Sequence, residues 1–391
     1  MKLSEKPKLI RTATIALSLD FLLKGQLSFL QKHYEVIAVS GEDNHLKEVA
    51  NREQVRTINL SMQRNISLLK DLVSLWQLYV LFKNEKPQIV HSITPKAGLL
   101  SMIAAYFARV PIRIHTFTGL IFPSKKGLLK LLLLNMDRVL CLFATHIFPE
   151  GQGVKNDLKK YSITKKPLKV IANGNVNGID TAYFNSEHFS EQSKLDLKIK
   201  LGIPLNDFVF IFVGRLVKDK GINELVTAFK LLQKEKSTVK LILVGNYESD
   251  LDPLESKTLE IINTNKSILS VGFQNEVRTY FSIADALVFP SYREGFPNVV
   301  MQAGAMNLPS IVTDINGCNE IIQENNNGFI IPVKNQSAIF DAMKKMIDNP
   351  VLLDEMKQQA RTMIVSRYKQ EVVWNAIQLE YSRCSNEMLN Q

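Results

Sequence analysis

Asp207-Phe-Val-Phe-Ile-Phe-Val-Gly-Arg-Leu-Val-Lys-Asp-Lys-Gly221 is an apolar run that ends at a glycine and a basic loop. The run is rich in β-branched and aromatic residues, and a segment of helical period follows from about Ile222. A short, continuously apolar run is typical of a strand in a parallel sheet, because helices cover both faces of such sheets. This stretch therefore predicts a strand, a loop and a helix.

The same alternation of apolar runs and helical segments extends along the chain. We predict strands in the first half at 9–15, 35–40, 56–60, 88–92, 112–117, 145–148 and 168–171, and in the second half at 207–214, 239–245, 268–271, 286–290, 310–313 and 328–331. Alternating strands and helices form parallel sheets with helices on both faces. The sequence thus predicts an α/β protein with two Rossmann-like, doubly wound parallel-sheet domains.

A turn-rich segment marks the boundary between the two domains. A chain of 391 residues is too long for one ordinary core and is expected to form two domains. Residues 173–180, Asn-Gly-Asn-Val-Asn-Gly-Ile-Asp, are packed with turn formers. We predict an N-terminal domain over 1–180 and a C-terminal domain over 181–369. The last predicted helix, 370–391, is expected to return to the first domain.

The composition is that of a globular protein. Apolar residues make up 46% of the chain and charged residues 22%, which excludes intrinsic disorder and collagen-like or disulfide-rich scaffolds. The three widely spaced cysteines give neither a zinc site nor a redox pair, and we expect them to be buried as small hydrophobic residues. No secretory segment follows the polar N-terminal residues, and charges interrupt the most apolar window, 127–148. We expect a cytoplasmic protein.

Positive charge is concentrated in the first half. Residues 1–184 contain 26 Lys and Arg against 13 Asp and Glu, a net charge of +13, whereas the rest contains 22 against 25, a net charge of −3. A basic half favours an anionic partner, which can be nucleic acid, a phosphorylated substrate or an acidic membrane surface. Because basic patches interleaved with aromatic residues are absent, we expect no nucleic acid partner.

Two cations lie in the loop that follows the strand at 207–214. Ligands of open α/β sheets bind at the carboxyl ends of the strands, so we expect the two domains to face each other across a central cleft. Arg215 and Lys220 follow the turn at Gly214 and precede a helix N-terminus, which favours anions. This arrangement predicts a pyrophosphate site, and the alternative is a solvated basic turn.

A second loop carries an acid after its strand. Ser291-Tyr-Arg-Glu-Gly-Phe-Pro-Asn-Val-Val-Met-Gln-Ala-Gly304 follows a predicted strand. We expect Gly295 to allow a sharp turn and Pro297 to occupy the first turn of the next helix. Glu294 can then accept hydrogen bonds from sugar hydroxyls, and Gln302, two turns along the same helix, can bond a ribose. The alternative is a capping acid and a partly buried glutamine.

Weaker candidates follow other strands. Gly272-Phe273 ends a strand of the second domain, where its backbone can bond a flat nucleobase. In the first domain we expect His91 and Lys96 near the cleft edge, and His115 lies in the next strand. Each histidine has the alternative of a core residue with satisfied hydrogen bonds. Gly25, before a helix, either lets a phosphate approach or only starts the helix.

Several catalytic and cofactor-binding motifs are absent. No Gly-x-Gly-x-x-Gly follows the first strand, and Gly-x4-Gly-Lys-Ser/Thr, His-Glu-x-x-His and Gly-x-Ser-x-Gly do not occur. Asp250-Leu-Asp252 imitates a metal-binding pair but lies in a polar loop. We therefore expect neither a metal nor a cofactor.

Taken together, these motifs resemble the retaining glycosyltransferases of family 4, which have the GT-B fold. Gly214-Arg-x4-Lys-Gly221, Gly272-Phe273 and Arg293-Glu-Gly-Phe-Pro-Asn298 stand at the family's order and spacing. Asn177-Gly-Ile-Asp180 is similar to the motif that closes the family's first domain. Residues 91–98, His-Ser-Ile-Thr-Pro-Lys-Ala-Gly, and 24–26, Lys-Gly-Gln, resemble a bacterial subgroup that builds capsule, O-antigen or precursor oligosaccharides on lipid carriers.

The resemblance implies roles for these residues. Arg215 and Lys220 would bind the donor diphosphate, and Glu294 would contact the donor sugar, so these three form the catalytic set. The residues implied in donor binding are Gly25, Gly214, Gly272, Phe273, Gly295, Phe296, Pro297, Asn298 and Gln302. The residues implied on the acceptor or sugar side are His91, Lys96, His115 and Thr118.

The chain departs from the family pattern at three positions. The second glutamate of the family's pair is Gln302 here, and a neutral hydrogen bond is about half as strong as a charge-assisted one. The Gly-Gly of the first-domain loop is reduced to Gly25. Where the family has a histidine after the fourth or fifth strand, this chain has Thr118, with His115 three positions earlier.

The resemblance implies a hexosyltransferase-type activity. A sugar would move from a nucleotide-sugar, a UDP-sugar, to a saccharide acceptor on undecaprenyl diphosphate, with retention and without a divalent ion. The alternatives are a sugar-nucleotide 2-epimerase of the same fold and a non-catalytic sugar-nucleotide-binding protein. The window 127–148, with Lys125, Lys126 and Lys130, either lies on the anionic inner face of the cell membrane or forms a plain core helix.

Overall fold

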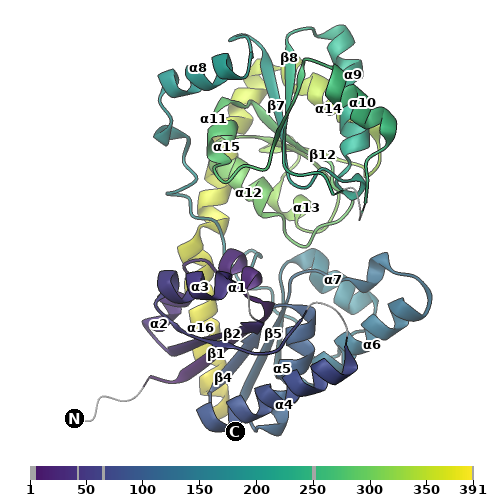
Figure 1. Cartoon of the computed structure of the whole chain (residues 1–391). Coiled ribbons are helices and arrows are strands. Elements are labelled where there is room, and N and C mark those ends of the chain that lie inside the picture. The colour runs from purple at the N-terminus through teal and green to yellow at the C-terminus, as the bar shows by residue number, and fades with distance from the viewer. Residues whose placement is uncertain (1–5, 42–43, 64–66, 249–251, 390–391) are drawn as a thin grey trace. The chain divides into compact units, whose positions relative to one another are not determined.

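The computed structural model describes residues 6–41, 44–63, 67–248 and 252–389 (Figure 1). The chain divides into two compact units, one of residues 1–178 with 370–391 and one of residues 179–369. The sequence places the boundary after residue 180, and the structure places it after Gly178.

The first unit is built on a six-stranded parallel sheet with the strand order β3-β2-β1-β4-β5-β6. Its strands are β1 Lys8–Ile15, β2 Glu35–Gly41, β3 Arg56–Asn59, β4 Ile89–Ser92, β5 Ile112–Phe117 and β6 His146–Pro149. Its helices are α1 Ala16–Leu22, α2 Gln26–Gln31, α3 His45–Glu53, α4 Leu68–Glu85, α5 Pro95–Phe107, α6 Gly127–Phe143, α7 Gln152–Lys160 and α16 Gln370–Leu389. Alternate residues of β1 feed two cores on opposite faces of the sheet: Leu9 lies in one and Ile10 in the other.

The strand predicted at 168–171 is wrong. Within this segment only Leu168 forms an isolated bridge, to Ile147 of β6. Pro167 has no N–H to donate to a ladder, and Lys169 turns its ammonium to Glu380 of α16 instead of packing on the sheet. The first sheet therefore has six strands among the described residues.

The last helix belongs to the first unit, as Figure 1 shows. The buried residues of α16 recur at helical spacing and pack into the core around Leu9; they are Val373, Ile377, Tyr381 and Cys384. Trp374 Nε1 donates to Asn177 Oδ1 over 2.7 Å, and the Asn177 amide donates to the Lys24 carbonyl over 2.9 Å. These bonds tie the first residue of the Asn177-Gly-Ile-Asp180 motif to α16 and to the loop before α2.

The alternative of a plain core helix for the 127–148 window is wrong. Only Leu140 and Cys141 are fully buried within α6. Leu128 is 86% exposed and Leu142 69% exposed. The sequence pattern alone could not separate an apolar helix that is covered from one that is not.

The second unit has a single core around another six-stranded parallel sheet, with the order β12-β11-β10-β7-β8-β9. Its strands, all predicted from the sequence, are β7 Phe208–Val213, β8 Val239–Val244, β9 Ile268–Gly272, β10 Ala286–Phe289, β11 Ser310–Thr313 and β12 Gly328–Ile331. Its helices are α8 Glu191–Lys200, α9 Ile222–Glu235, α10 Ser256–Thr264, α11 Arg278–Ile283, α12 Asn298–Ala305, α13 Cys318–Ile321, α14 Gln336–Asp348 and α15 Pro350–Tyr368. The predicted α/β class with two doubly wound sheets is confirmed.

Two smaller expectations concern the cysteines and the apolar window. All three cysteines are buried and unbridged, as expected for small hydrophobic residues. Among the described residues, no helix has the length and apolarity that crossing a bilayer requires.

Candidate active site

Three strand-end loops of the second unit are packed so closely that glycine is required. A Cβ on Gly245, just after β8, would lie 1.8 Å from the Gly214 carbonyl oxygen, just after β7. A Cβ on Gly221 would lie 2.2 Å from the Pro290 carbonyl oxygen, just after β10. Gly221 has φ 71° and caps the N-terminus of α9, so a side chain there would also strain the backbone. These contacts bring the loops after β7, β8 and β10 together at the carboxyl edge of the sheet.

Lys220 and Glu294 meet at this edge although 74 positions separate them in the chain. Lys220 Nζ donates to Glu294 Oε1, and both side chains are largely shielded. Ser291 Oγ donates to the same oxygen over 2.8 Å, and the Lys220 ammonium lies 5.6 Å from the centre of the Phe289 ring. Oε2 of Glu294 keeps no such contact among the described residues and remains able to accept a hydrogen bond.

The motif resemblance assigns Arg215 to the donor diphosphate, whereas in the structure its guanidinium is paired with the carboxylate of Glu248. Its side chain is 50% exposed, and its guanidinium donates to Glu248 Oε2 over 2.6 Å. Sequence reasoning missed Glu248 and Ser291. Both follow strands at the same sheet edge, and that position was the available signal, since parallel strands bring their carboxyl ends together.

The loop that carries Glu294 corrects two expectations. Gly295 does lie at a bend of this loop, but its φ is not positive, so the bend does not use the left-handed region that favours glycine. Pro297 is the N-cap of α12 and not part of its first turn. Glu294 precedes the helix, so Gln302 is only four residues beyond the first helical residue, Asn298, and is half-buried. The loop therefore includes Pro297, and α12 begins one residue later than it would if the proline stood in its first turn.

Close packing holds this loop in place. The Phe296 ring is 6% exposed and lies 5.5 Å from the Tyr368 ring, edge to face, so this side chain anchors the loop in the core. A Cβ on Gly317 would lie 2.6 Å from the Gly295 carbonyl oxygen. Any contact of Phe296 with a ligand must accordingly come from its backbone.

The end of β9 presents an exposed aromatic ring. Gly272 has φ 69°, and its carbonyl accepts the Gly245 N–H over 2.9 Å. The next residue, Phe273, is 64% exposed. Exposure of a large ring at a strand end is unfavourable in water and offers a surface on which a flat base can stack.

In the first unit, His91 does not lie at a cleft edge as expected but is buried in the core. Its Nδ1 lies 2.5 Å from the Tyr381 hydroxyl and its Nε2 2.7 Å from Thr116 Oγ1. Burial, with the Arg11 charge nearby, holds the pKa of His91 well below its usual range. The alternative of a satisfied core histidine is therefore the correct interpretation.

His115 is also a core residue, whereas Thr118 lies closer to the surface. His115 Nδ1 lies 2.8 Å from Ser92 Oγ, and burial lowers its pKa to about 3. A Cβ on Gly98 would lie 2.4 Å from the His115 ring, so the ring has no freedom to turn outward. Thr118 is half-buried, and its hydroxyl donates to the Ile93 carbonyl over 3.3 Å. Of the two, Thr118 is the one with a partly exposed side chain.

Acid should destabilise the fold through His115. The folded state keeps this ring neutral down to a pKa of about 3, while the unfolded chain binds a proton near pH 6.5, so stability falls as pH falls through this window. We expect His115→Gln to remove up to ~1.4 kcal/mol per pH unit of that slope. Urea unfolding of both proteins at several pH values between 7 and 4 measures the difference, and parallel pH dependences would contradict the assignment.

The remaining first-unit candidates are held by protein partners. Lys96 forms an ion pair of 2.6 Å with Asp71 of α4. The Gly25 N–H donates to Glu53 Oε1 over 2.8 Å, and a Cβ on Gly25 would lie 2.7 Å from the Trp374 ring. Approach of a phosphate to Gly25 is therefore not supported, and close packing against α16 explains the glycine.

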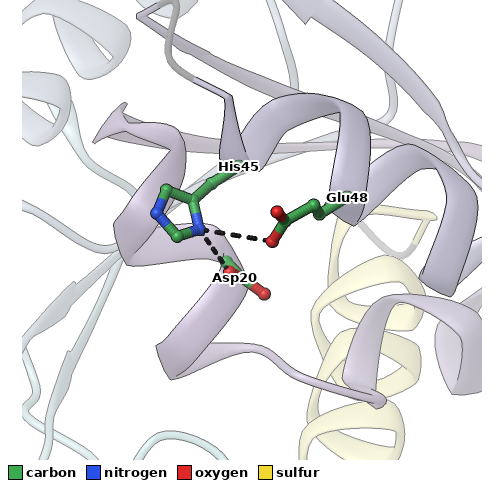
Figure 2. A group of neighbouring side chains, drawn as sticks. All are labelled: Asp20, His45 and Glu48. Atoms are coloured by element: carbon green, nitrogen blue, oxygen red, sulfur yellow. Dashed lines mark hydrogen bonds and ion pairs between the residues drawn. The ribbon is translucent and has the colours of Figure 1, made fainter. Parts of the chain in front are cut away.

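One cluster of metal-type ligands in the part of the chain that the structure describes was missed from the sequence. Figure 2 shows one nitrogen of the His45 ring facing both Asp20 and Glu48; this Nδ1 lies 2.6 Å from Asp20 Oδ2 and 3.5 Å from Glu48 Oε2. Arg52 binds the other oxygen of Asp20. Since a guanidinium already compensates the buried carboxylate, the cluster is explained by its own ion pairs. Of the suspected pair Asp250 and Asp252, the first lies outside the described residues, and Asp252 Oδ2 accepts the Asp219 N–H over 2.6 Å.

Comparison with known proteins gives the class of this chain. The profile of the family "Glycosyl transferases group 1" matches residues 193–363, and that of "Glycosyltransferase Family 4" matches residues 27–181. A capsular polysaccharide biosynthesis glycosyltransferase of Staphylococcus aureus, CapM, is 32% identical over 379 residues, which cover 96% of this chain and 97% of that protein. The chain belongs to the family 4 glycosyltransferases.

Two further comparisons bear on the enzyme and on the fold. A UDP-Gal:alpha-D-GlcNAc-diphosphoundecaprenol alpha-1,3-galactosyltransferase of Escherichia coli is 32% identical over 78% of each chain. Anabaena HepE in complex with UDP aligns with a TM-score of 0.81 at 16% identity, over 96% of this chain and all of that one. The fold is GT-B, and the protein is a hexosyltransferase-type glycosyltransferase, as the resemblance of its motifs implied.

Proposed function

We propose that this enzyme moves a sugar from a UDP-sugar to a hydroxyl of an undecaprenyl-diphosphate-linked saccharide in surface polysaccharide biosynthesis. The pair of Lys220 and Glu294 in the second unit is the observation that carries the proposal. It sets a cation and an acid side by side at the carboxyl edge of a parallel sheet, where ligands bind. CapM and the E. coli galactosyltransferase, named for capsule synthesis and for a lipid-linked acceptor, support the substrate class.

The loop after β7 is suited to the donor diphosphate. Lys220 and Arg215 lie on this loop, and α9, a helix of 14 residues, begins immediately after it. Backbone N–H groups and the helix dipole favour an anion at that end. In the proposed complex these groups stabilise the charge that grows on the leaving diphosphate. Phe273 offers a surface for the base, and Gln302 can bond the ribose.

Glu294 is proposed to position the donor sugar. Oε1 is occupied by Lys220 and Ser291, so Oε2 is the oxygen that accepts a sugar hydroxyl. A carboxylate already paired with a cation is a poor nucleophile, which disfavours the double displacement of glycosidases. We infer a front-face transfer with retention: the bond from C1 to the phosphate oxygen breaks, the acceptor oxygen bonds to C1 from the same side, and the leaving phosphate takes the acceptor's proton.

A donor panel assayed with lipid-linked acceptors tests this proposal. Transfer from UDP-sugars, with UDP as the second product, is expected. Isomerised UDP-sugar formed without any acceptor would instead favour the 2-epimerase alternative. Nucleotide-sugar binding with no turnover on any acceptor would favour a non-catalytic sensor.

The proposed chemistry needs no divalent ion, because side-chain cations and backbone amides stabilise the diphosphate. We expect the transfer rate with excess EDTA to stay within about twofold of the rate of the untreated enzyme. Removal of a catalytic Lewis acid would cost several kcal/mol of transition-state stabilisation and would lower the rate far more. Initial rates with EDTA and with added magnesium ions check this. A rate that collapses with EDTA and recovers with magnesium ions would contradict it.

We propose that α6 and α4 contact the inner face of the cell membrane. Both helices pack against α5, and both carry exposed apolar side chains. The most exposed of these are Leu68, Leu69, Leu72, Trp76, Leu128 and Leu142. Lys125 and Lys126, next to the start of α6, are exposed as well. An apolar helix surface with cationic neighbours binds anionic lipid in two ways: its apolar side chains are buried in the bilayer, and its cations are attracted to the charged headgroups.

Replacing Leu128 and Leu132 with aspartate should detach the enzyme from anionic vesicles. Each leucine contributes ~1.5–3 kcal/mol when fully buried, so the pair is expected to weaken binding by at least ~10-fold. Co-sedimentation with phosphatidylglycerol vesicles measures this. Leu205→Asp is the matched control, because Leu205 is 62% exposed on the other unit. Equal binding by all three proteins would contradict the proposed surface.

A further inference from the structure

A small pocket in the first unit is not used by the donor site. Its lining residues come from α5, the loop after β5 and α6, and they are Pro95, Leu99, Gly119, Ile121, Leu133, Met136 and Asp137. Pro95 comes three residues after the end of β4, and Gly119 two residues after the end of β5. The pocket therefore lies where ligands of a parallel sheet bind, at the carboxyl ends of two adjacent strands.

Asp137 is the one ionisable residue in this lining. The structure gives its carboxyl no hydrogen bond and no ion pair among the described residues, and its apolar surroundings raise its pKa to about 7. The cations nearest in sequence on α6 are engaged elsewhere: Lys130 lies over the Tyr161 ring, and Arg138 donates to the Tyr161 carbonyl. An unpaired acid against apolar walls destabilises a fold unless a partner binds it.

The size and chemistry of the pocket select the group that fits. Its volume is about 30 Å³, which accommodates a methyl-sized group and excludes a sugar ring. Its walls are apolar apart from a single hydrogen-bond acceptor. An acetamido substituent has both matching parts, an apolar methyl and an N–H donor, whereas a hydroxyl group would leave the apolar walls uncovered.

We propose that this pocket binds the acetamido group of the acceptor saccharide, with the methyl against Leu99, Leu133 and Met136 and the N–H donated to the Asp137 carboxylate. The inference rests on the proposed function, since it names the acceptor class of that reaction. It makes Asp137 a specificity-determining residue, because the acetamido methyl fills the apolar space and shields the bond between the N–H and the carboxylate from water, which strengthens that bond. A hydroxyl at this place can also donate to the carboxylate, but it leaves the apolar space open to water, where the same bond is weaker.

The test compares two acceptors that differ only in this group. Short-chain lipid diphosphates that carry N-acetylglucosamine or glucose are assayed with the wild type, Asp137→Leu and Asp137→Asn. We expect the wild type to prefer the acetamido acceptor by at least ~10-fold in kcat/KM and Asp137→Leu to reduce that ratio towards one. Asp137→Asn, whose amide oxygen still accepts the N–H, should lie between them. Asn135→Leu, on the same helix with an exposed side chain, should keep the wild-type ratio.

Two outcomes overturn the inference while leaving the proposed function standing: a wild-type ratio near one, or a ratio that Asp137→Leu does not change. If no acceptor is glycosylated, the proposed function is refuted, and a measurement of acceptor binding then tests the role of the pocket separately. In saturation-transfer NMR with the N-acetylglucosamine lipid diphosphate, the acetamido methyl should receive more saturation than the ring protons in the wild type and lose that excess in Asp137→Leu. Equal saturation of methyl and ring protons would overturn the inference.

Discussion

Glu294→Ala should abolish most of the transferase activity while the protein still binds UDP. The substitution removes the oxygen that is proposed to accept the sugar hydroxyl and also the partner that holds Lys220. Loss of one preorganised group at a reacting centre costs ~100- to 1,000-fold in kcat. The binding of UDP should change by less than about threefold, because in the proposed complex the phosphates contact the loop after β7 and not the carboxylate.

Steady-state kinetics and calorimetry with UDP measure these two quantities on the same preparations. Glu294→Gln is the informative comparison, since it keeps the shape and removes the charge. We expect it to retain more activity than alanine but to remain at least ~10-fold below the wild type, as charge-assisted bonds are about twice as strong as neutral ones. Wild-type rates in the alanine variant would refute the role of Glu294.

Lys220→Ala should have an effect of similar size but of a different kind. Lys220 is the largely shielded cation of its loop, with 15% of its side chain exposed. Its removal takes charge from the leaving diphosphate and leaves Glu294 unpaired, so both kcat and UDP affinity should fall, with kcat/KM reduced by at least ~1,000-fold. Lys218→Ala is the matched control, because Lys218 belongs to the same short turn and is exposed.

The double variant tests whether the two residues act as a unit. Groups in one ion pair are not additive, so Lys220→Ala with Glu294→Ala should cost little more than either change alone. Arg215→Ala should cost less than Lys220→Ala, because its guanidinium is half exposed and paired with Glu248. Fully additive losses would contradict the pair as the functional element.

The fold could be predicted from the sequence because its signals are local. Buried parallel strands form continuous apolar runs, and all six strands of the second unit were found in this way. The prediction for 168–171 failed because Pro167 precedes the segment and Lys169 interrupts its apolar residues, a pattern that describes a sheet edge as well as a strand. The exposure of α6 was equally undecidable, since a leucine-rich helix has the same sequence whether or not another element covers it.

The candidate site was predictable only to the level of its loops. Lys220 and Glu294 could be named because their motifs follow strands, and parallel topology brings strand ends together. The partner that each charged side chain takes depends on tertiary packing, so Glu248, which pairs with Arg215, and Ser291, which bonds Glu294, were missed. His91 was misplaced for the same reason: its position near the end of a strand resembles that of a ligand-binding residue, but Tyr381 and Thr116 enclose it. In the sequence, Asp137 is one of the charges that interrupt the apolar window 127–148, and nothing in that pattern indicates a pocket.

The anomeric configuration of the product tests the central claim most directly. A proton NMR time course with a UDP-α-sugar, a lipid-diphosphate saccharide and the wild-type enzyme follows the donor's anomeric signal into the product. The account predicts a new glycosidic bond with the α configuration and an equal release of UDP. A β-linked product, or loss of the UDP-sugar without a new glycosidic signal, would contradict it.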